Sequence, residues 1–318
     1  KPSFFEITVA MAFDYFAQNN IDIAIIETGL GGRLDSTNII TPVLSVITNI
    51  GFDHMNILGD TLEKIAYEKA GIIKQNIPVV IGETSAETKH IFEKVAAENN
   101  AAIVFADKER YVSDWNYSHH QLNITVAKTN SDTHENYTLD LTGIYQTKNI
   151  ITVLETIHQL QKLGWKIDND AIEKGLSHAK KITGLYGRWE LIHQKPFVII
   201  DVAHNVDGIK QVAEQLELMS FSHLHIITGI VKDKEAEKIL ALLPKYADYY
   251  FTKAQIPRAL HEDELAAKAN LFELKGKKYP DVNIALQDAL QHAEEDDLIL
   301  VCGSVYLAGE VNLNLSSS

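Results

Sequence analysis

The sequence has little cysteine, no apolar run of membrane-spanning length, and no complete copy of several common catalytic motifs. A single cysteine, Cys302, among 318 residues excludes an internal disulfide and is typical of a reducing compartment. No apolar run approaches the length that crosses a bilayer, and the first residues lack the basic-then-apolar form of a signal peptide. These absences predict a cytoplasmic protein.

Three motifs that would assign a chemistry directly are missing. No GxxxxGK[ST] phosphate-binding loop occurs in the sequence. Gly29, Gly31 and Gly32 do not complete GxGxxG, because its third glycine would fall at Leu34, so a dinucleotide fold is weakly supported. Cys302 lies in a run typical of a strand, with no GxSxG-like turn, which argues against a covalent nucleophile.

The charge balance narrows the range of partners. A formal net charge of −14 argues against a nucleic acid or an anionic membrane surface. A hydrophobic content of 46% and a charged content of 23% are ordinary for a globular protein, and the length suggests two domains. An acidic protein can still bind a nucleotide, since local cations set the field at the site. We expect small-molecule partners and a monomer.

The first third of the chain has the pattern of an α/β domain. Short apolar runs have the form of strands buried on both faces of a parallel sheet. They lie at 21–27, 43–49, 78–81 and 101–105. Helical spacing and capping residues predict helices over 3–19, 61–71 and 85–99.

The middle of the chain changes character. From 111 to 142, polar and apolar residues alternate, which predicts a small antiparallel sheet. Helices are expected over 145–162 and 168–180. Thr183–Gly187 contains two glycines between regular elements and is the best linker candidate. We therefore place the domains at 1–184 and 185–318.

Beyond the linker, strands and helices alternate as in a doubly wound α/β domain. Strands are expected at 189–193, 197–203, 224–229, 249–252 and 298–303. Helices are expected near 207–218, 233–243, 261–269 and 283–294.

The most informative segment is IIETGLGGRLDSTNI, residues 25–39, in which an apolar run ends on one acid, Glu27, and enters a glycine turn. Buried strands that deliver one carboxylate to such a loop are a common way to hold Mg²⁺ beside a nucleotide phosphate. A second run repeats the arrangement with His54, followed by a helix that bears Lys69. Two strand ends would then bring Glu27, His54 and Lys69 together. Alternatively, Glu27 caps a helix or pairs with Arg33.

His54 and Lys69 each have a structural and a functional interpretation. A histidine past the carboxyl edge of a sheet is more often structural, yet a neutral imidazole is a competent metal ligand. Lys69 has Ile65 where an ion-pairing acid would lie, which favours a semi-buried amine with a depressed pKa. A neutral amine can add CO₂ and become an anionic carbamate ligand.

The second half carries a further group of candidates. Asp201 lies near a predicted strand end, where acids often accept hydrogen bonds from ribose hydroxyls. Asn205 or Asp207 can instead simply cap the next helix, and both interpretations can hold together. Asn149 either contacts an adenine edge or is a surface amide.

Six segments, taken in order, resemble the bifunctional folylpolyglutamate synthase/dihydrofolate synthase family of the Mur ligase superfamily. They are ETGLGGRLDSTNI (27–39), TNIGFDHMNILGDT (48–61), EKAGIIK (68–74), YGRWELI (186–192), DVAHNVDG (201–208) and LVCGSVYLAGEV (300–311). The resemblance covers nearly the whole chain, with agreeing spacing. It implies an α/β, Mur-ligase-like fold, with an incomplete P-loop-type central domain followed by a Rossmann-like C-terminal domain.

In that family, ATP phosphorylates the carboxylate of dihydropteroate or a folate, and the amine of L-glutamate then displaces phosphate. The resemblance implies ATP as co-substrate and Mg²⁺ at two sites. It implies the metal ligands Glu27, His54 and a carbamate on Lys69, with catalytic roles for Lys69, His54 and His204. Implied ATP contacts are Asn149, Arg188 and Asp201. Implied substrate contacts are Ser3, Leu34, Asp35, Ser36 and Ser304, with His204 and Ser304 near the incoming glutamate.

One departure from the family is large. Its members begin with a strand and a GTNGKGS-like loop, and this chain starts after both. We therefore expect an N-terminally truncated fragment with little or no activity, an unpaired sheet edge and exposed apolar surface. Two other functions stay open: another Mur-type ligase that builds peptides, and a non-catalytic remnant that binds folate or a partner.

Overall fold

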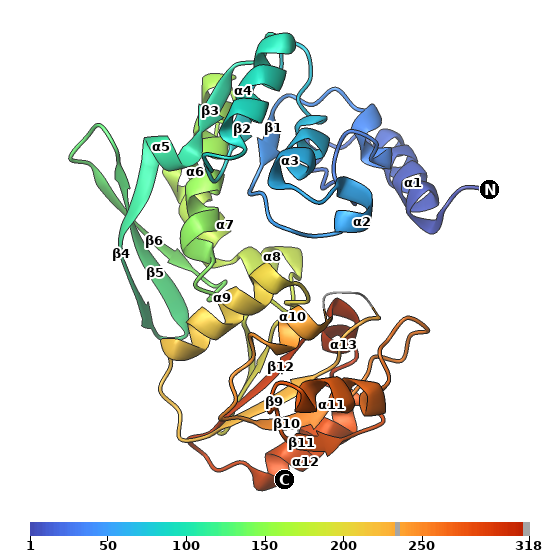
Figure 1. The fold of residues 1–318 in the computed structure, drawn as a ribbon. Coiled ribbons are helices and arrows are strands. Elements are labelled where there is room, and N and C mark those ends of the chain that lie inside the picture. The colour runs from blue at the N-terminus through green and yellow to red at the C-terminus, as the bar shows by residue number, and fades with distance from the viewer. Residues whose placement is uncertain (233–235, 314–318) are drawn as a thin grey trace. The chain divides into compact units, whose positions relative to one another are not determined.

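The structure, a computed structural model, describes residues 1–232 and 236–313 and contains two α/β units (Figure 1). Unit 1 comprises residues 1–113, 125–135 and 147–168. Unit 2 comprises 114–124, 136–146 and the described part of 169–318. The first residues of the helix predicted at 233–243, and the last five of the predicted C-terminal domain, lie outside the described residues. The domain boundary at 184 stays a prediction.

Unit 1 is built on a three-stranded parallel sheet in the order β1-β2-β3. Its strands are β1 (Ser45–Ile47), β2 (Val79–Ile81) and β3 (Ile103–Phe105). The central strand, β2, is almost fully buried along its length, which explains its uninterrupted apolar sequence. The three strands predicted here at 43–49, 78–81 and 101–105 are confirmed. Each observed strand is shorter than its predicted range.

Helices predicted around this sheet are also present. They are α1 (Phe4–Gln18), α3 (Leu62–Ala70) and α4 (Lys89–Glu98), with the short α2 (Met55–Leu58) and α5 (Ala106–Glu109) in addition. Thr61 caps α3 as its sequence predicted, because its hydroxyl accepts a 3.3 Å hydrogen bond from the Lys64 amide. Ala66 of α3 and Phe92 of α4 pack on the sheet and complete the core of the unit.

The predicted strand over residues 21–27 is wrong. This segment has no regular structure, and the sheet ends at β1. Its isoleucines, Ile21, Ile23 and Ile25, are exposed, Ile25 to 93%. A strand needs a neighbour for its backbone hydrogen bonds, and among the described residues no strand lies on that side of β1.

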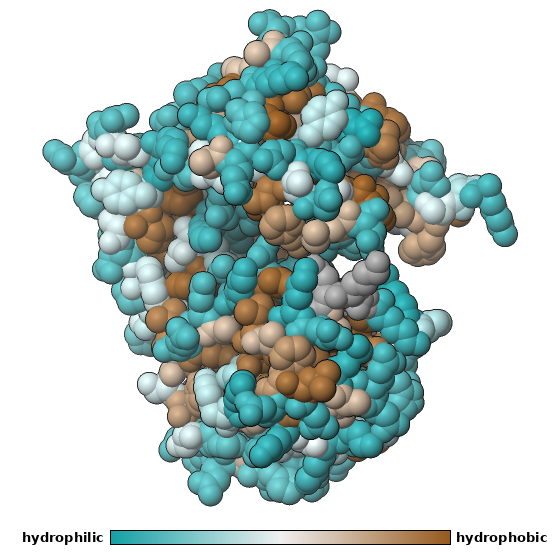
Figure 2. Space-filling view, viewed as in Figure 1, coloured by the Kyte–Doolittle hydropathy of each residue, from teal (hydrophilic) through white to brown (hydrophobic). Residues whose placement is uncertain are grey.

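Exposed apolar surface is concentrated in the same part of unit 1, as the sequence predicted. Helix α1 buries only Val9, while Phe4, Met11 and Tyr15 are exposed. Figure 2 shows apolar side chains, in brown, at the surface beside the α1 region.

The alternating region forms the predicted small sheet. Its strands, in the order β4-β5-β6, are β4 (Arg110–Ser118), β5 (Gln121–Lys128) and β6 (His134–Leu139). Helix α6 (Gln146–Lys162) follows, as expected. The single helix predicted at 168–180 is two, α7 (Asn169–Ser177) and α8 (Ala179–Thr183), because His178 leaves the helical backbone region between them.

Unit 2 is centred on a six-stranded sheet in the order β11-β10-β9-β12-β8-β7. Its strands are β7 (Glu190–Gln194), β8 (Phe197–Ile200), β9 (Leu224–Thr228), β10 (Asp248–Phe251), β11 (Gly276–Lys278) and β12 (Leu298–Cys302). Every neighbouring pair is parallel except β7 with β8. The short strand β11 was not predicted.

Helices cover both faces of this sheet, so it is doubly wound as expected. They are α9 (Val206–Glu217), α10 (Ala236–Leu240), α11 (Glu262–Asn270), α12 (Val282–His292) and α13 (Val305–Gly309). Successive strand residues point to opposite faces: Leu300 of β12 packs in one buried cluster and Val301 in the other. No described helix is long and apolar enough to cross a bilayer.

Candidate functional site

The glycine loop of the first motif lies directly on the C-terminal end of α3. The Arg33 amide donates a 2.7 Å hydrogen bond to the Glu68 carbonyl, and the Arg33 guanidinium forms a 2.9 Å ion pair with the Glu68 carboxylate. The Asn38 side-chain amide donates to the Gly71 carbonyl at 2.9 Å. The segments 27–39 and 68–74, which are far apart in sequence, therefore form one local structure.

Two glycines permit this close approach. A Cβ atom at Gly32 would lie 2.9 Å from the carbonyl oxygens of Glu68 and Lys69. A Cβ atom at Gly71 would lie 2.3 Å from the Cα atom of Arg33. Any side chain at either position would push the loop away from the helix end that carries Lys69.

Gly71→Ala is expected to destabilise unit 1 by about 1–3 kcal/mol, since backbone atoms must move to admit the methyl group. It should also lower ligase turnover, because a shift of about 1 Å near a reacting centre can cost on the order of 10²-fold. Urea denaturation and a steady-state assay check both. Gly175→Ala is the matched control: no atom lies within 4 Å of its added Cβ, so the exposed helix α7 should gain about 0.5–1 kcal/mol. Equal stabilities of the two variants would contradict the packing argument.

The polar residues of this loop mainly hold its shape. Asp35 accepts hydrogen bonds from the Leu30 amide at 2.8 Å and from the Thr37 amide and hydroxyl at 2.9 and 2.6 Å. Partial burial raises the pKa of Asp35, but these hydrogen bonds outweigh it and the net pKa is lowered. Asp35 thus remains an ionised cap of the 3₁₀ turn at 36–39. Leu34 is 78% exposed, and Ser36 is partly exposed.

Ser3 caps helix α1. Its hydroxyl accepts a 3.2 Å hydrogen bond from the Glu6 amide, and its own amide donates to the Glu6 carboxylate at 2.6 Å. This capping box accounts for the serine by itself. Its implied role in substrate binding stays a prediction, as do those of Leu34, Asp35 and Ser36.

Lys69 is half-buried at the end of α3. Burial lowers the pKa of its amine, and the negative charge of Asp53 partly opposes that shift. The turn containing Asp53 and His54 therefore lies near Lys69, as the two sequence motifs predicted. His54 itself has a left-handed backbone conformation (φ 48°), an exposed ring, and Nε2 at 3.7 Å from Asp53 Oδ1.

Glu27 is exposed at the end of the segment that was predicted to be a strand. The alternative in which it pairs with Arg33 is not observed, because Arg33 pairs with Glu68. Its carboxylate and the His54 ring offer oxygen and nitrogen donors that suit a divalent cation. A protonated Lys69 would repel such a cation, whereas a carbamate on Lys69 would supply another anionic oxygen. These donor types suit Mg²⁺, and a magnesium site shared by Glu27, His54 and Lys69 stays a prediction.

Asn149 is exposed in the first turn of α6. Thr152, nearly one turn later, packs so closely on Gly82 that a Cβ at Gly82 would lie 2.3 Å from the Thr152 hydroxyl. Gly82 directly follows β2, so the start of α6 lies at the carboxyl edge of the unit 1 sheet. Ligands of α/β sheets bind at that edge, which is compatible with either interpretation of Asn149.

Asp201 is buried directly after β8 in unit 2. It accepts hydrogen bonds from the Trp189 amide at 2.9 Å, the Ala203 amide at 2.8 Å and the Tyr145 hydroxyl at 3.1 Å. Burial raises its pKa, while these bonds and the positive charge of Arg188 oppose the rise. Arg188 and Asp201, both implied nucleotide contacts, are therefore close to one another.

His204 and Ser304 come together at the carboxyl edge of the unit 2 sheet. They follow the neighbouring strands β8 and β12, and the Gly303 amide donates a 2.9 Å hydrogen bond to the Ala203 carbonyl. His204 Nδ1 lies 3.0 Å from the Val202 carbonyl, which can only accept, so Nδ1 carries the proton. In the neutral ring, Nε2 is then an acceptor. Ser304 caps α13, since its hydroxyl accepts from the Tyr306 amide at 3.2 Å.

The capping interpretation of Asn205 is confirmed, because its side chain accepts a 2.8 Å hydrogen bond from the Gly208 amide. Sequence reasoning missed Tyr145, whose hydroxyl reaches Asp201 and whose pKa is raised by burial and by that carboxylate. Its only sequence signal is its place near the start of α6. Burial also raises the pKa of the Cys302 thiol to about 12, which agrees with the argument against a covalent nucleophile.

Two family models match the chain. The model described as Mur ligase middle domain matches residues 3–157. The model described as Mur ligase, glutamate ligase domain matches residues 187–305. The first match ends at residue 157 and the second begins at residue 187.

Close relatives agree with these models. The chain is 33% identical to the dihydrofolate synthase/folylpolyglutamate synthase of Bacillus subtilis (strain 168), over 99% of this chain and 73% of that protein. E. coli FolC in complex with DHPP and ADP has a TM-score of 0.81 at 29% identity, over 96% of this chain and 69% of that one. A bifunctional folylpolyglutamate synthase/dihydrofolate synthase with Mn, AMPPNP and L-glutamate bound has a TM-score of 0.78 at 28% identity. The match covers 97% of this chain and 70% of that one.

Proposed function

The chain belongs to the dihydrofolate synthase/folylpolyglutamate synthase family of Mur ligases, and we propose that it joins L-glutamate to the carboxylate of dihydropteroate or a folate. It is an ATP-dependent ligase of folate metabolism. The proposed acceptor rests on relatives whose structures contain DHPP, ADP, AMPPNP and L-glutamate. An acyl phosphate would form first, and the glutamate amine would then displace phosphate.

One observation carries the proposal most directly: a half-buried lysine with a lowered pKa is held at the helix end beneath the glycine loop. A lysine that only faces solvent does not need a glycine loop packed against the end of its helix. Lowering the pKa increases the neutral fraction of the amine. The neutral nitrogen can attack the carbon of CO₂ and release one N–H proton to solvent, which leaves an anionic carbamate on Lys69.

Glu27, His54 and the Lys69 carbamate would hold Mg²⁺ at two sites, as the family resemblance implies. When bound, Mg²⁺ supplies positive charge that stabilises transferring phosphoryl oxygens. The residues of unit 2 would act on the substrates themselves. Arg188 would bind phosphate oxygens and Asp201 a ribose hydroxyl.

His204 and Ser304 are suited to the incoming glutamate. An ammonium group cannot attack an acyl phosphate, so the amine must first lose a proton. The unprotonated Nε2 of His204 can accept that proton, because Nδ1–H is directed to the Val202 carbonyl. Ser304 retains its hydroxyl proton as a donor, since its oxygen already accepts from Tyr306.

A coupled ADP-release assay tests the function. Dihydropteroate, tetrahydrofolate and a peptide-precursor carboxylate are compared as acceptors, each with and without L-glutamate. The assay uses residues 1–318 and also a form extended by any upstream coding sequence. Since residues 1–318 contain no GxxxxGK[ST] loop, we expect slow turnover by this chain alone. ADP release that needs both a pteridine acceptor and L-glutamate supports the proposal. Turnover with the peptide precursor alone, or folate binding without turnover in either form, would contradict it.

A further inference from the structure

Two histidines and an aspartate cluster at the amino edge of the unit 2 sheet, the edge opposite Asp201, His204 and Ser304. His223 directly precedes β9, His225 lies within it, and Asp248 begins the neighbouring strand β10. Residues two apart on a strand share a face, and Asp248 lies directly opposite His225 in the β9–β10 register. The three side chains therefore project from the same side of two adjacent strands.

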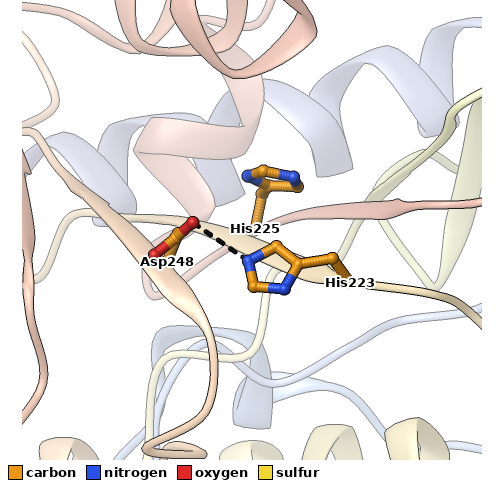
Figure 3. A group of neighbouring side chains, drawn as sticks. All are labelled: His223, His225 and Asp248. Atoms are coloured by element: carbon orange, nitrogen blue, oxygen red, sulfur yellow. Dashed lines mark hydrogen bonds and ion pairs between the residues drawn. The ribbon is translucent and has the colours of Figure 1, made fainter. Parts of the chain in front are cut away.

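The three residues are close enough to share one ion. One nitrogen of each histidine and one carboxylate oxygen of Asp248 all lie within 4.8 Å of one another. His223 Nε2 lies 2.9 Å from Asp248 Oδ2, and the His225 ring lies beside that pair (Figure 3). Two ligands of a tetrahedral zinc ion are about 3.3 Å apart, since each bond is about 2.0–2.1 Å. The exposed side chains of His223 and Asp248 can rotate, which would bring the three ligand atoms from within 4.8 Å of one another to the spacing that zinc requires.

His225 provides an independent indication. Its residue is only 3% exposed, and its Nε2 forms no hydrogen bond among the described residues, although it lies 3.5 Å from Asp297 Oδ2. Its Nδ1 lies 3.2 Å from the Tyr250 hydroxyl. A buried imidazole with an unsatisfied nitrogen is costly unless a partner completes its bonding.

The surroundings favour a cation. The run Glu294, Glu295, Asp296 and Asp297 immediately precedes β12, and the Leu298 amide bonds to the His223 carbonyl at 2.9 Å. Lys195 offsets one of these acids, through a 3.0 Å contact with Glu295. The buried carboxylate of Asp297 lies 3.5 Å from His225 Nε2 and adds negative charge beside the nitrogen that would bind the ion, while the Tyr250 hydroxyl lies 3.2 Å from Nδ1.

We propose that His223, His225 and Asp248 bind a divalent transition-metal ion of the zinc class, with water in the remaining position and the Asp297 carboxylate as a neighbouring negative charge. Two imidazoles and one carboxylate suit zinc, whereas magnesium prefers oxygen ligands. Such an ion would link β9 to β10 at the edge away from the ligase residues. Its expected role is to stabilise unit 2, and it goes beyond the proposed function.

The test is zinc binding to the tag-free, nucleotide-free chain, measured by isothermal titration calorimetry and by bound metal after dialysis. Wild type should bind zinc and unfold at a higher temperature when loaded, and equal concentrations of Mg²⁺ should not compete. His223→Ala and Asp248→Asn, both at exposed positions, should each weaken binding by about 100-fold or more. Asp297→Asn should weaken it by about 10-fold or less, because it removes only a neighbouring negative charge.

Two controls separate this site from other histidines. His292→Ala removes an exposed imidazole that lies 3.7 Å from Asp288 Oδ2, and should leave binding unchanged. A titration in excess Mg²⁺ keeps the proposed magnesium site occupied, so that the zinc bound under that condition reports on His223, His225 and Asp248. Absence of zinc binding by wild type would overturn the proposal. Unaltered binding by folded His223→Ala and Asp248→Asn variants would overturn it as well, because the ion would then lie elsewhere.

Discussion

Lys69→Ala is expected to lower ligase turnover by on the order of 10²–10³-fold, the usual effect of removing one preorganised group that stabilises transition-state charge. The loss should be in kcat as well as in kcat/KM, because the carbamate would act on the transferring phosphoryl group. Lys69→Arg should be equally inactive, since a guanidinium keeps the positive charge but does not form the carbamate. Steady-state ADP release checks both variants, measured in whichever form turns over with the wild-type sequence.

Lys64→Ala is the matched control. Lys64 lies on the same helix but is exposed and pairs with Asp60 at 2.7 Å, so its removal should change turnover less than twofold. A second readout separates the carbamate from a purely structural role. Depletion of dissolved CO₂ should inactivate wild type reversibly, and more readily at lower pH, because protonation removes the neutral amine. Full activity of Lys69→Arg would contradict the carbamate.

Asp201→Asn is expected to destabilise unit 2 by about 1–3 kcal/mol, the cost of leaving buried donors unsatisfied. The two carboxylate oxygens accept from the amides of Trp189 and Ala203, one each, and from the Tyr145 hydroxyl. An asparagine can present only one oxygen, so its amide group would face a backbone N–H. Urea denaturation followed by the fluorescence of the buried Trp189 measures the change.

The pH dependence of this loss has a defined sign. The folded-state pKa of Asp201 is raised above its ordinary value of 3.8, with burial as the largest cause. Its contribution to stability is therefore fully present below that value and falls as pH rises through the folded pKa. The stability gap between wild type and Asp201→Asn should be largest in acid.

The control for this substitution is Asp207→Asn in the first turn of α9. Asp207 is half-exposed and pairs only weakly with Lys210, at 3.6 Å, so the loss should stay below about 1 kcal/mol. Equal losses for the two variants would show that the buried hydrogen bonds of Asp201 contribute little.

Much of the fold was predictable because local chemistry decided it. Val79–Ile81 reads as a strand buried on both faces, and Thr61 reads as a helix cap, from the sequence alone. The glycine loop and the segment with Lys69 do come together as predicted, but through hydrogen bonds between the loop and the end of α3, since residues 21–27 form no strand. The same reasoning gave a wrong strand at 21–27, because an apolar run forms a strand only when another strand is beside it.

The sequence by itself determined the family, the α/β layering and which residues could carry the chemistry, since these follow from periodicity and from motifs a few residues long. Only the tertiary structure decided how those residues are used. It joined Asp201 to Tyr145 across 56 residues and held the glycine loop against the end of α3 that carries Lys69. It also set His225 opposite Asp248. The physical reason is that strand register and burial depend on packing between distant segments, which no local pattern encodes.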